Sequence, residues 1–515
     1  MDKILVLDFG GQTTQLIARR IRDIGVYSEI LPGNTVLSSP SLQGVKGLVF
    51  SGSPYSVYEV DSPEPDESAY AAGLPILGIC YGFHQISRRF GAKVEAHDTT
   101  EYGRSPVAFL KESRLFKDVP DGFVSWMSHG DSIAELPEPF RILAKSNSFV
   151  AAAEREQEGY YGIQFHPEVT HCEYGREILE NFSIGICGAS KEWNMDRFLD
   201  QAIGEIREGA GDRDVLLLIS GGVDSMVVAG LLLRSLKPEK VHLLYIDTGL
   251  MRKNETPEIE ENLSKLGARN LYVVDASVEY LTALEEVTDP EKKRTIIGDI
   301  FVRIQDREIK ERGIGDALLA QGTLYPDMIE SGKGVGKHAH IIKSHHNVRS
   351  PLIEAKRKAG QIIEPLRLLY KDEVRTLGGL VGLEKKVIGR HPFPGPGLAV
   401  RILGELTKEK CDVLREADAI FIEELRTRGL YDQIWQAFCV LLPIRSVGVT
   451  GDVRKYGYVL SLRAVISRDA MTADVYPFEP KALLEISSRI TNTVSSIGRV
   501  VYDISSKPPA TIEWE

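Results

Sequence analysis

A cysteine between two glycines is the first group in this sequence that could carry out chemistry. Gly78 and Gly82 flank Cys80, which follows an apolar, strand-like run and precedes a stretch with helical character. Glycines at these positions permit the tight strand-to-helix turn that exposes a nucleophile, as in the G-x-S-x-G elbow. A helix N-terminus behind the cysteine favours the thiolate, which is the reactive form. Cys80 is therefore a candidate nucleophile.

The base that would serve this cysteine is expected in the later sequence His166-Pro167-Glu168. The proline biases His166 toward an extended backbone, and residues two apart in an extended segment face the same way. Glu168 can then orient and polarise the imidazole. The two residues complete a Cys-His-Glu triad with Cys80.

Backbone N–H groups are the expected stabilisers of an oxyanion at this site. The candidates are Tyr81, directly after the nucleophile, and Gly52 in the turn 51–54. The alternative is structural, because a lone cysteine after a strand is usually a packing residue. The glycine-flanked elbow together with the His-Pro-Glu sequence favours catalysis over packing.

These residues resemble the class I glutamine amidotransferase domain, and the resemblance covers the N-terminal third of the chain. It implies that Cys80 attacks the carboxamide of glutamine, that a glutamyl thioester forms, and that ammonia is released while His166 shuttles protons. Two positions depart from the family pattern. His84, followed by Gln85, stands where the family commonly has glutamine, and Ser53 stands where it usually has glycine.

A second cluster indicates a phosphate-binding loop. The apolar run 216–219 leads into Ser-Gly-Gly-Val-Asp-Ser, and a helical stretch follows. Strand, glycine turn and helix N-terminus form an anion cradle, because exposed N–H groups and the helix dipole favour phosphate. Asp224 is a candidate ligand for the Mg²⁺ that accompanies a polyphosphate. The predicted ATP-binding residues of the loop are Ser220, Gly221, Gly222, Val223, Asp224 and Ser225.

The full Ser-Gly-Gly-x-Asp-Ser sequence resembles the N-type ATP pyrophosphatase family, whereas a glycine turn alone would indicate only a tight connection. No Gly-Lys-Ser/Thr follows, so the loop is not a Walker A motif. The resemblance implies cleavage of ATP between the α and β phosphates, an adenylylated intermediate and release of pyrophosphate. The resemblance also implies that Asp247, at the end of the next strand-like run, lies near the adenosine of ATP.

The order of the two modules is similar to that in the glutamine-hydrolysing GMP synthase family, and the similarity runs from end to end. This resemblance implies transfer of AMP from ATP onto XMP, followed by displacement of AMP by ammonia. Mg²⁺ with ATP is the implied cofactor, and no tightly bound organic cofactor is expected.

The same resemblance assigns XMP to Arg294, Lys507 and Glu513. Lys343 lies in a basic segment that is expected to act as a lid and to reach the transferring phosphate when closed. No role is predicted for Thr450, where the family often has glutamine or methionine.

Two other interpretations remain open: an ATP pyrophosphatase acting on RNA, such as a thiolase, and a non-catalytic regulatory or assembly protein. The net charge of −11 and the absence of a Cys-x-x-Cys pair count against the first, so no nucleic acid partner is predicted. The intact triad and phosphate loop count against the second.

The chain of 515 residues is too long for one core. Its patterning predicts an α/β fold: two mainly parallel, doubly wound α/β domains followed by a smaller α+β domain. The expected boundaries are 1–188 for the amidotransferase, 189–392 for the ATP pyrophosphatase and 393–515 for the third domain. By resemblance the third domain binds XMP and forms a homodimer.

The sequence offers no sign of a membrane protein. No apolar run approaches the roughly 20 residues that a membrane span needs, and the N-terminus lacks the layout of a signal peptide. A cytoplasmic protein that acts on glutamine, ATP and XMP, without a membrane partner, is therefore expected.

Overall fold

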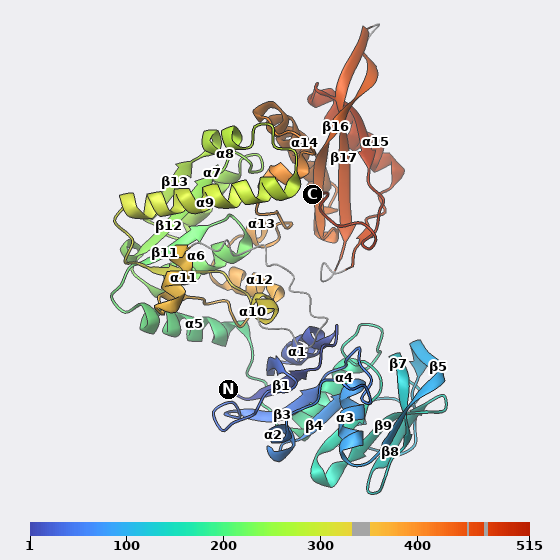
Figure 1. Ribbon diagram of the computed structural model, residues 1–515. Helices are drawn as coiled ribbons and strands as arrows, with labels where there is room; N and C mark the ends of the chain where they lie inside the picture. The colour runs from blue at the N-terminus through green and yellow to red at the C-terminus, as the bar shows by residue number, and fades with distance from the viewer. Residues whose placement is uncertain (332–350, 451–452, 468–471) are drawn as a thin grey trace. The chain divides into compact units, whose positions relative to one another are not determined.

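The computed structural model describes residues 1–331, 351–450, 453–467 and 472–515. The chain divides into two compact units (Figure 1). Unit 1 comprises Met1–Phe198 and the helix α10 (Tyr325–Ser331). Unit 2 comprises Leu199–Leu324 and the described residues from 351 onward. Along these described ranges, no helix is both long enough and apolar enough to cross a membrane.

Unit 1 is built on an eight-stranded mixed sheet with the strand order β2-β1-β3-β4-β10-β9-β8-β6. The first five of these strands pair in parallel and the last three are antiparallel. The strand order reverses between β1 and β3, and loops at such a switch point form ligand crevices in α/β sheets. The strands are β1 (Lys3–Asp8), β2 (Tyr27–Pro32), β3 (Val45–Phe50), β4 (Ile76–Ile79), β6 (Ala108–Phe109), β8 (Arg141–Ser146), β9 (Phe149–Arg155) and β10 (Tyr160–Ile163).

Helices pack on this sheet, and a separate two-stranded ribbon, β5 (Lys93–Pro106) with β7 (Val124–Glu135), completes the unit. The parallel strands are largely buried because both of their faces are covered. The helices are α1 (Thr14–Asp23), α2 (Glu67–Ala71), α3 (Tyr81–Arg89) and α4 (Gly175–Glu180), which continues into a π-helical turn at Asn181–Ile186.

Unit 2 begins with a five-stranded parallel sheet in the order β13-β12-β11-β14-β15. Its order also reverses, between β11 and β14, so the loop after β11 lies at a second switch point. The strands are β11 (Val215–Ile219), β12 (Val241–Asp247), β13 (Asn270–Asp275), β14 (Leu318–Ala320) and β15 (Ile362–Ile363).

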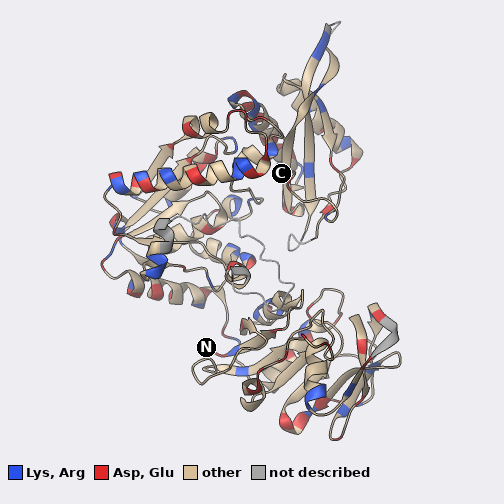
Figure 2. Cartoon of the chain, viewed as in Figure 1, with Lys and Arg blue, Asp and Glu red and all other residues tan. Residues whose placement is uncertain are grey.

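One of the helices that connect these strands, α9, begins with residues typical of a helix N-terminus. Asp289 caps α9, its carboxylate accepting from the N–H of Lys292 at 2.8 Å, and Pro290 occupies the first helical position. Acidic and basic residues are interspersed along the same helix (Figure 2). The helices are α5 (Met195–Ala210), α6 (Val223–Ser235), α7 (Glu255–Lys265), α8 (Ser277–Ala283), α9 (Pro290–Glu311), α11 (Pro351–Lys358), α12 (Lys371–Leu380) and α13 (Lys385–Ile388).

The C-terminal part of unit 2 is an α+β arrangement in which β17 (Val453–Ile466) pairs with three other strands. These partners are β16 (Gln436–Thr450), β18 (Asp474–Val475) and β19 (Ile497–Tyr502), and the helices are α14 (Lys408–Thr427) and α15 (Pro480–Thr493). The ends of β16 and β17 form a hairpin arm that projects beyond the rest of this sheet (Figure 1).

The predicted fold class is confirmed: both α/β sheets and the following α+β region are present. One contiguous apolar core in unit 2 runs from Leu216 on β11 through Leu414 on α14 to Ile497 on β19. The five-stranded parallel sheet and the C-terminal region are thus joined by shared packing. The boundaries 1–188, 189–392 and 393–515 stay predictions.

Candidate active sites

The turn between β4 and α3 holds Cys80 in a conformation that few non-glycine residues adopt. Its φ of 52° lies in the left-handed region, and the strain is maintained by the packing of the turn. A Cβ on Gly78 would lie 2.5 Å from the carbonyl group of Gly82, and one on Gly82 would lie 2.3 Å from the carbonyl oxygen of Phe50. Both glycines are therefore required by the close approach of other backbone atoms, and the predicted elbow is present.

The structure brings the predicted base and its orienting acid to this cysteine. His166 follows β10, and its backbone N–H donates to the carbonyl of Trp126 at 3.0 Å. Its Nδ1 lies 2.7 Å from Oε1 of Glu168, whose side chain is completely buried. The imidazole also hydrogen bonds with Cys80. The structure thus brings together the three side chains of the predicted triad, and their catalytic roles stay a prediction.

The protonation of His166 reflects a balance between burial and charge. Burial opposes the imidazolium, but the carboxylate of Glu168 and the hydrogen bonds to Cys80 and Glu168 outweigh it, raising the pKa of His166 well above 6.5. A cationic imidazole beside a cysteine is suited to hold a thiolate and later to give its proton to a leaving amine.

The turn after β3 approaches the triad where an oxyanion would form. A Cβ on Gly52 would lie 3.2 Å from Cε1 of His166 and 4.0 Å from Cβ of Cys80, so Gly52 borders both residues. α3 begins at Tyr81, whose N–H belongs to the helix-terminal groups that have no intrahelical acceptor. The positions of Gly52 and Tyr81 are therefore compatible with the predicted oxyanion role. Gly11, after β1, packs against the Gly52 carbonyl, where a Cβ would come within 2.5 Å of its oxygen.

Two further groups contact the candidate nucleophile, and neither was predicted from the sequence. Nε2 of Gln164 lies 3.7 Å from Sγ of Cys80, and the carbonyl oxygen of Ser128 lies 3.8 Å from the same sulfur. His84 bonds the other end of the Gln164 amide. Gln164 stands two residues before His166, so the alternation that predicted Glu168 could also have indicated Gln164.

The predicted phosphate loop of unit 2 connects β11 to α6. Gly221 has φ 78°, and a Cβ there would lie 2.7 Å from Cδ1 of Ile259. Oγ of Ser220 accepts from the N–H of Gly222 at 3.3 Å and lies 3.2 Å from Oγ of Ser225. The turn is thereby closed on itself at the N-terminus of α6, a ready anion site by helix dipole and free N–H groups.

Asp224 in this loop forms an ion pair with Lys371, a partner that was not predicted from the sequence. Both carboxylate oxygens lie 2.6 Å from Nζ of Lys371, which begins α12. A Cβ on Gly322, after β14, would lie 3.4 Å from Cβ of Asp224, so the carboxylate is next to the sheet's switch point. One carboxylate beside a phosphate cradle fits Mg²⁺, which takes one or two protein carboxylates together with phosphate and water oxygens.

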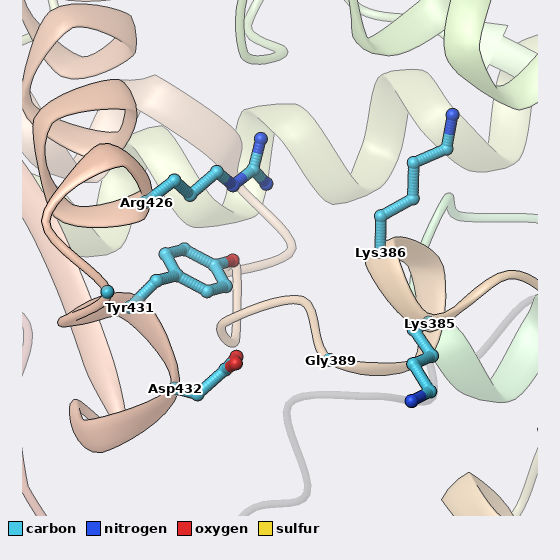
Figure 3. Close-up of a pocket in the computed structure, with 7 residues that line it drawn as sticks. Lys385, Lys386, Gly389, Arg426, Tyr431 and Asp432 are labelled. Atoms are coloured by element: carbon cyan, nitrogen blue, oxygen red, sulfur yellow. The ribbon is translucent and has the colours of Figure 1, made fainter.

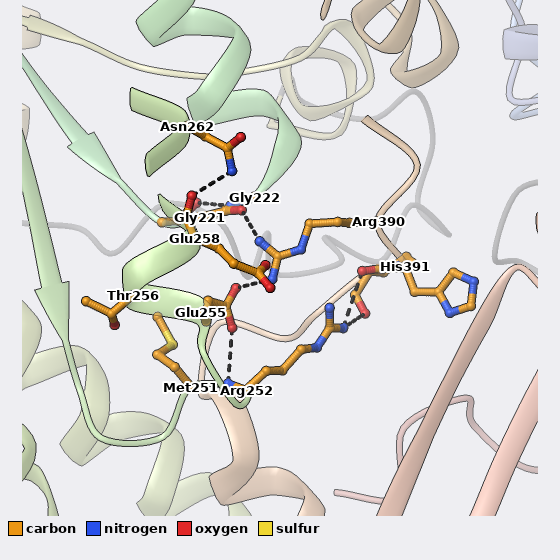
Figure 4. Close-up of polar contacts among 12 residues, drawn as sticks. Gly221, Gly222, Met251, Arg252, Glu255, Thr256, Glu258, Asn262, Arg390 and His391 are labelled. Atoms are coloured by element: carbon orange, nitrogen blue, oxygen red, sulfur yellow. Dashed lines mark hydrogen bonds and ion pairs between the residues drawn. The ribbon is translucent and has the colours of Figure 1, made fainter. Parts of the chain in front are cut away.

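Polar contacts from residues later in the chain hold the phosphate loop in place (Figure 4). Arg390 donates to the carbonyl of Gly221 at 3.4 Å and to the buried carboxylate of Glu255 at 2.8 Å. Glu255 also accepts from the backbone N–H of Arg252 at 3.1 Å. Arg252 in turn donates to the carbonyl of Pro392 at 3.1 Å. Arg390 therefore links the phosphate loop to the segment that follows α13.

Asp247 ends β12 at the carboxyl edge of the same sheet. Its carboxylate accepts from the N–H of Gly249 at 2.9 Å and from Oγ1 of Thr256 at 2.6 Å. These bonds fix the loop after β12. Asp247 and the phosphate loop follow neighbouring parallel strands, as the sequence predicts.

The three residues that the sequence assigns to XMP all take part in contacts of the C-terminal tail. Nη2 of Arg294 donates to the main-chain oxygen of Glu515 at 2.7 Å. Glu513 accepts from Arg401 at 2.8 and 3.1 Å and from Gln436 at 2.7 Å. The backbone of Lys507 pairs with Ala473, which docks the tail on the C-terminal region.

The C-terminal tail is also fixed by a fully buried lysine next to Arg294. Nζ of Lys293 donates to the carbonyls of Ala399 and Ile402 and lies 2.7 Å from Oε2 of Glu515. The tail is thus held to α9 by two adjacent residues of that helix.

Lys343, the predicted lid residue, lies outside the described residues. The four histidines of the same basic segment also lie outside them: His338, His340, His345 and His346. Thr450 ends β16. Among the residues that the structure describes, no group of three His, Cys, Asp or Glu side chains could hold a metal ion.

A small pocket of about 240 Å³ lies between α13 and the C-terminal region, and Figure 3 shows its lining. No residue predicted from the sequence lines it. The guanidinium of Arg426 lies 4.8 Å from the ring centre of Tyr431, and His391 stacks on the same ring at 3.8 Å. The pocket is lined by Lys385, Lys386, Gly389, Arg426, Gly429, Tyr431 and Asp432.

Known families match both ends of the chain. The model of the class-I glutamine amidotransferase family matches residues 5–186, and the model of the GMP synthase C-terminal domain matches residues 423–514. A curated glutamine-hydrolyzing GMP synthase from Petrotoga mobilis is 48% identical over 518 residues and is covered, like this chain, to 100%. Proteins of the same name from Aquifex aeolicus and Chlorobaculum tepidum are each 49% identical, with at least 99% of both chains covered.

The elbow with its His-Glu pair defines the class: a class I glutamine amidotransferase, here followed by a second unit with a parallel α/β sheet. The full-length identity to curated relatives then defines the family. The chain belongs to the glutamine-hydrolysing GMP synthases.

Proposed function

We propose that this member of the GMP synthase family divides its reaction between two sites, with ammonia made in unit 1 and consumed in unit 2. The overall reaction converts XMP, ATP and glutamine, with water, into GMP, AMP, pyrophosphate and glutamate. Membership of the family supports the reaction. The observation that carries the division is that each unit has its own strand–turn–helix site.

In unit 1 the Cys80 thiolate attacks the carboxamide carbon of glutamine. The N–H groups of Gly52 and Tyr81 stabilise the oxyanion that forms. His166 gives its proton to the departing ammonia, leaving a glutamyl thioester. The imidazole then takes a proton from water, whose attack releases glutamate and restores the thiolate–imidazolium pair. Glu168 holds the ring in the required tautomer and orientation throughout.

In unit 2 the loop from Ser220 to Ser225 binds the β and γ phosphates of ATP, and Asp247 faces the adenosine. The 2-oxygen of XMP attacks the α phosphorus, the bond to the β phosphate breaks, and pyrophosphate leaves. Ammonia then adds at C2 and AMP departs with the oxygen. When bound, Mg²⁺ would neutralise polyphosphate charge, and Asp224 would hold it.

The XMP site is proposed at the junction of α9 with the C-terminal tail. Arg294 and Lys507 supply positive charge for the phosphate, and Glu513 accepts hydrogen bonds from the purine. Arg294 and Glu513 already lie near the anchored tail, which supports a shared site. Lys343 is proposed to approach the transferring phosphate from the lid segment.

A homodimer through the C-terminal region is part of the proposal. The hairpin arm of β16 and β17 exposes apolar side chains at Ile444, Val447, Val449 and Tyr456. Val447 and Tyr456 lie opposite each other in the strand register. Exposed apolar residues gathered on one element are typical of a protein interface, and a second copy of this arm is the proposed partner.

The assignment of the acceptor is tested by measuring AMP and pyrophosphate release from Mg-ATP in the presence of ammonium chloride. We expect cleavage to require XMP, with one GMP formed per AMP. IMP and uncharged tRNA serve as control acceptors. Cleavage that is unaffected by XMP but triggered by RNA would overturn the assignment and restore the thiolase interpretation.

A further inference from the structure

The amide of Gln164 bridges two groups of the amidotransferase site that the triad does not include. Its Oε1 lies 2.7 Å from Nε2 of His84, and its Nε2 lies 3.7 Å from Sγ of Cys80, which is within hydrogen-bonding reach of a sulfur atom. Gln164 and His84 are both almost completely buried. The contacts therefore form a line from His84 through Gln164 to the nucleophile.

The protonation of His84 can be assigned from its surroundings. Burial lowers the pKa of His84 to about 4, although the hydrogen bond to Gln164 and the charge of Asp131 act in the opposite direction. His129, the other titratable group that faces it, also disfavours a second positive charge. At neutral pH the ring is uncharged, so only one of its nitrogens carries a proton.

The direction of the two hydrogen bonds is linked, because an amide has one accepting and one donating end. If Nε2–H of His84 donates to Oε1 of Gln164, the NH₂ group of Gln164 must face Cys80. If His84 carries its proton on Nδ1, the amide can turn over and present its oxygen to the sulfur. A thiolate accepts hydrogen bonds and is repelled by an oxygen lone pair. The reactive form of Cys80 is therefore compatible with the first arrangement only.

We propose that His84 is a positioning residue that locks the Gln164 amide with its N–H toward Cys80, making Gln164 a catalytic donor to the thiolate. The proposal rests on the assignment of Cys80 as nucleophile and adds a group that touches the reacting sulfur. The carbonyl of Ser128, 3.8 Å away, can accept only from the protonated thiol. Gln164 is the neutral counterpart that favours the thiolate, alongside the imidazolium of His166.

This arrangement explains why His84 can occupy a position where the family commonly has glutamine. Neutral histidine presents a ring N–H and glutamine presents an NH₂ group at the end of a planar side chain, so either can donate to an amide oxygen. A leucine has the bulk but no donor. The substitutions His84→Gln and His84→Leu therefore separate the donor function from simple filling of space.

The test measures carboxamidomethylation of Cys80 by iodoacetamide in the full chain, between pH 4.5 and 9.5, by peptide mass spectrometry. Burial raises the pKa of Cys172 to about 12 and that of Cys411 to about 11, so these thiols react slowly over this range. Ser87→Ala is the matched control, because Ser87 lies buried on the same helix and its hydroxyl has no partner among the described residues.

Gln164→Met should raise the midpoint pH of Cys80 alkylation by about one unit, which slows the reaction about tenfold below the midpoint. His84→Leu should shift it in the same direction, and the double variant should equal Gln164→Met alone, because both changes remove one donor. His84→Gln and Ser87→Ala should stay within about 0.3 units of the wild type. The melting temperature of each variant verifies folding, and Gln164→Met remains decisive if His84→Leu does not fold.

A midpoint that does not move in Gln164→Met, or that falls, would overturn the proposal, as would fully additive shifts in the double variant. Failure of the parent assignment would be recognised separately. In that case Cys80 of the wild type would show no enhanced reactivity at neutral pH, and Cys80→Ala would retain glutamine-dependent GMP formation.

Discussion

The amidotransferase site of unit 1 and the proposed ATP site of unit 2 share a strand–turn–helix plan but differ in how their polar groups are partnered. In unit 1 the contacts converge on the nucleophile: Glu168 bonds His166, and Gln164 reaches Cys80. In unit 2 the groups proposed for ligands are bonded to other protein groups. Asp224 pairs with Lys371, and Glu513 pairs with Arg401.

This difference indicates two modes of catalysis. The thiol site is preorganised, so its chemistry should depend on single side chains acting on glutamine. At the proposed nucleotide site, ATP, Mg²⁺ and XMP would replace internal ion pairs, so part of their binding free energy would offset contacts that are lost. Single substitutions can show whether the two sites are separable and whether the internal pairs differ in strength as their burial suggests.

The largest effect is expected for His166→Ala. Loss of the base should lower glutamine-dependent GMP formation about 10⁴-fold, because proton transfer to ammonia and from water both need the imidazole. Ammonia-dependent formation should stay within twofold of the wild type. His171→Ala, at an exposed histidine nearby, is the control. A parallel loss of both activities would mean that the sites are not separable.

Glu168→Gln should reduce glutamine-dependent activity between a hundredfold and a thousandfold. Its pH signature is more specific. The folded-state pKa of His166 is raised above 6.5, so its contribution to the free energy of unfolding is complete below pH 6.5 and is lost as pH rises through the raised pKa. The variant should lose this fall in stability with rising pH, as followed by urea unfolding between pH 6 and 9.

Glu177→Gln, on the exposed surface of α4, is the matched control for the carboxylate change. It should keep both the activity and the pH dependence of the wild type. If Glu168→Gln unfolds with the wild-type pH profile, the carboxylate does not hold the proton on His166.

The buried pair in unit 2 should contribute more than an exposed pair. Arg401 is fully buried and forms a bidentate pair with Glu513. Arg401→Met should lower the free energy of unfolding of unit 2 by about 3 kcal/mol, because it removes the buried cation and leaves the Glu513 carboxylate with only the Gln436 amide as a donor. The same change at Arg428, whose pairs are more exposed, should cost less than about 1 kcal/mol. Equal costs at the two positions would contradict the ranking by burial.

The smallest effect is expected for Lys371→Met. The pair with Asp224 is partly exposed, at 46% and 29% of the two side chains, so its loss should change the free energy of unfolding by less than about 1 kcal/mol. Asp224 would lose a competing cation, and the Mg²⁺ concentration for half-maximal ATP cleavage should fall up to about fivefold. An increased Mg²⁺ requirement would show instead that Lys371 assists phosphate binding.

Local signals in the sequence predicted the strands and the turns of both candidate sites, because each depends on neighbouring residues. The strand at 215–219 and the elbow around Cys80 match the structure, since apolar runs and glycine spacing act over a few positions. Alternation in an extended segment gave Glu168 from His166. The same alternation, followed from His166 toward the N-terminus, would have indicated Gln164.

Long-range partners could not be predicted in this way. Lys371 and Asp224 are 147 positions apart, and nothing near either residue identifies the other. The contacts of Arg390 with the phosphate loop are equally remote in sequence. The contiguous core of unit 2 likewise depends on tertiary packing between segments whose local patterns suggested separate domains.

The most direct test of the division of labour measures GMP formation by Cys80→Ala and Asp224→Ala, each with glutamine and with ammonium chloride. We expect Cys80→Ala to lose activity with glutamine, by at least about a thousandfold, and to keep it with ammonium. Asp224→Ala should lose activity with both nitrogen sources. If Cys80→Ala also fails with ammonium while remaining folded, ammonia production and XMP amination are not separate functions of the two units.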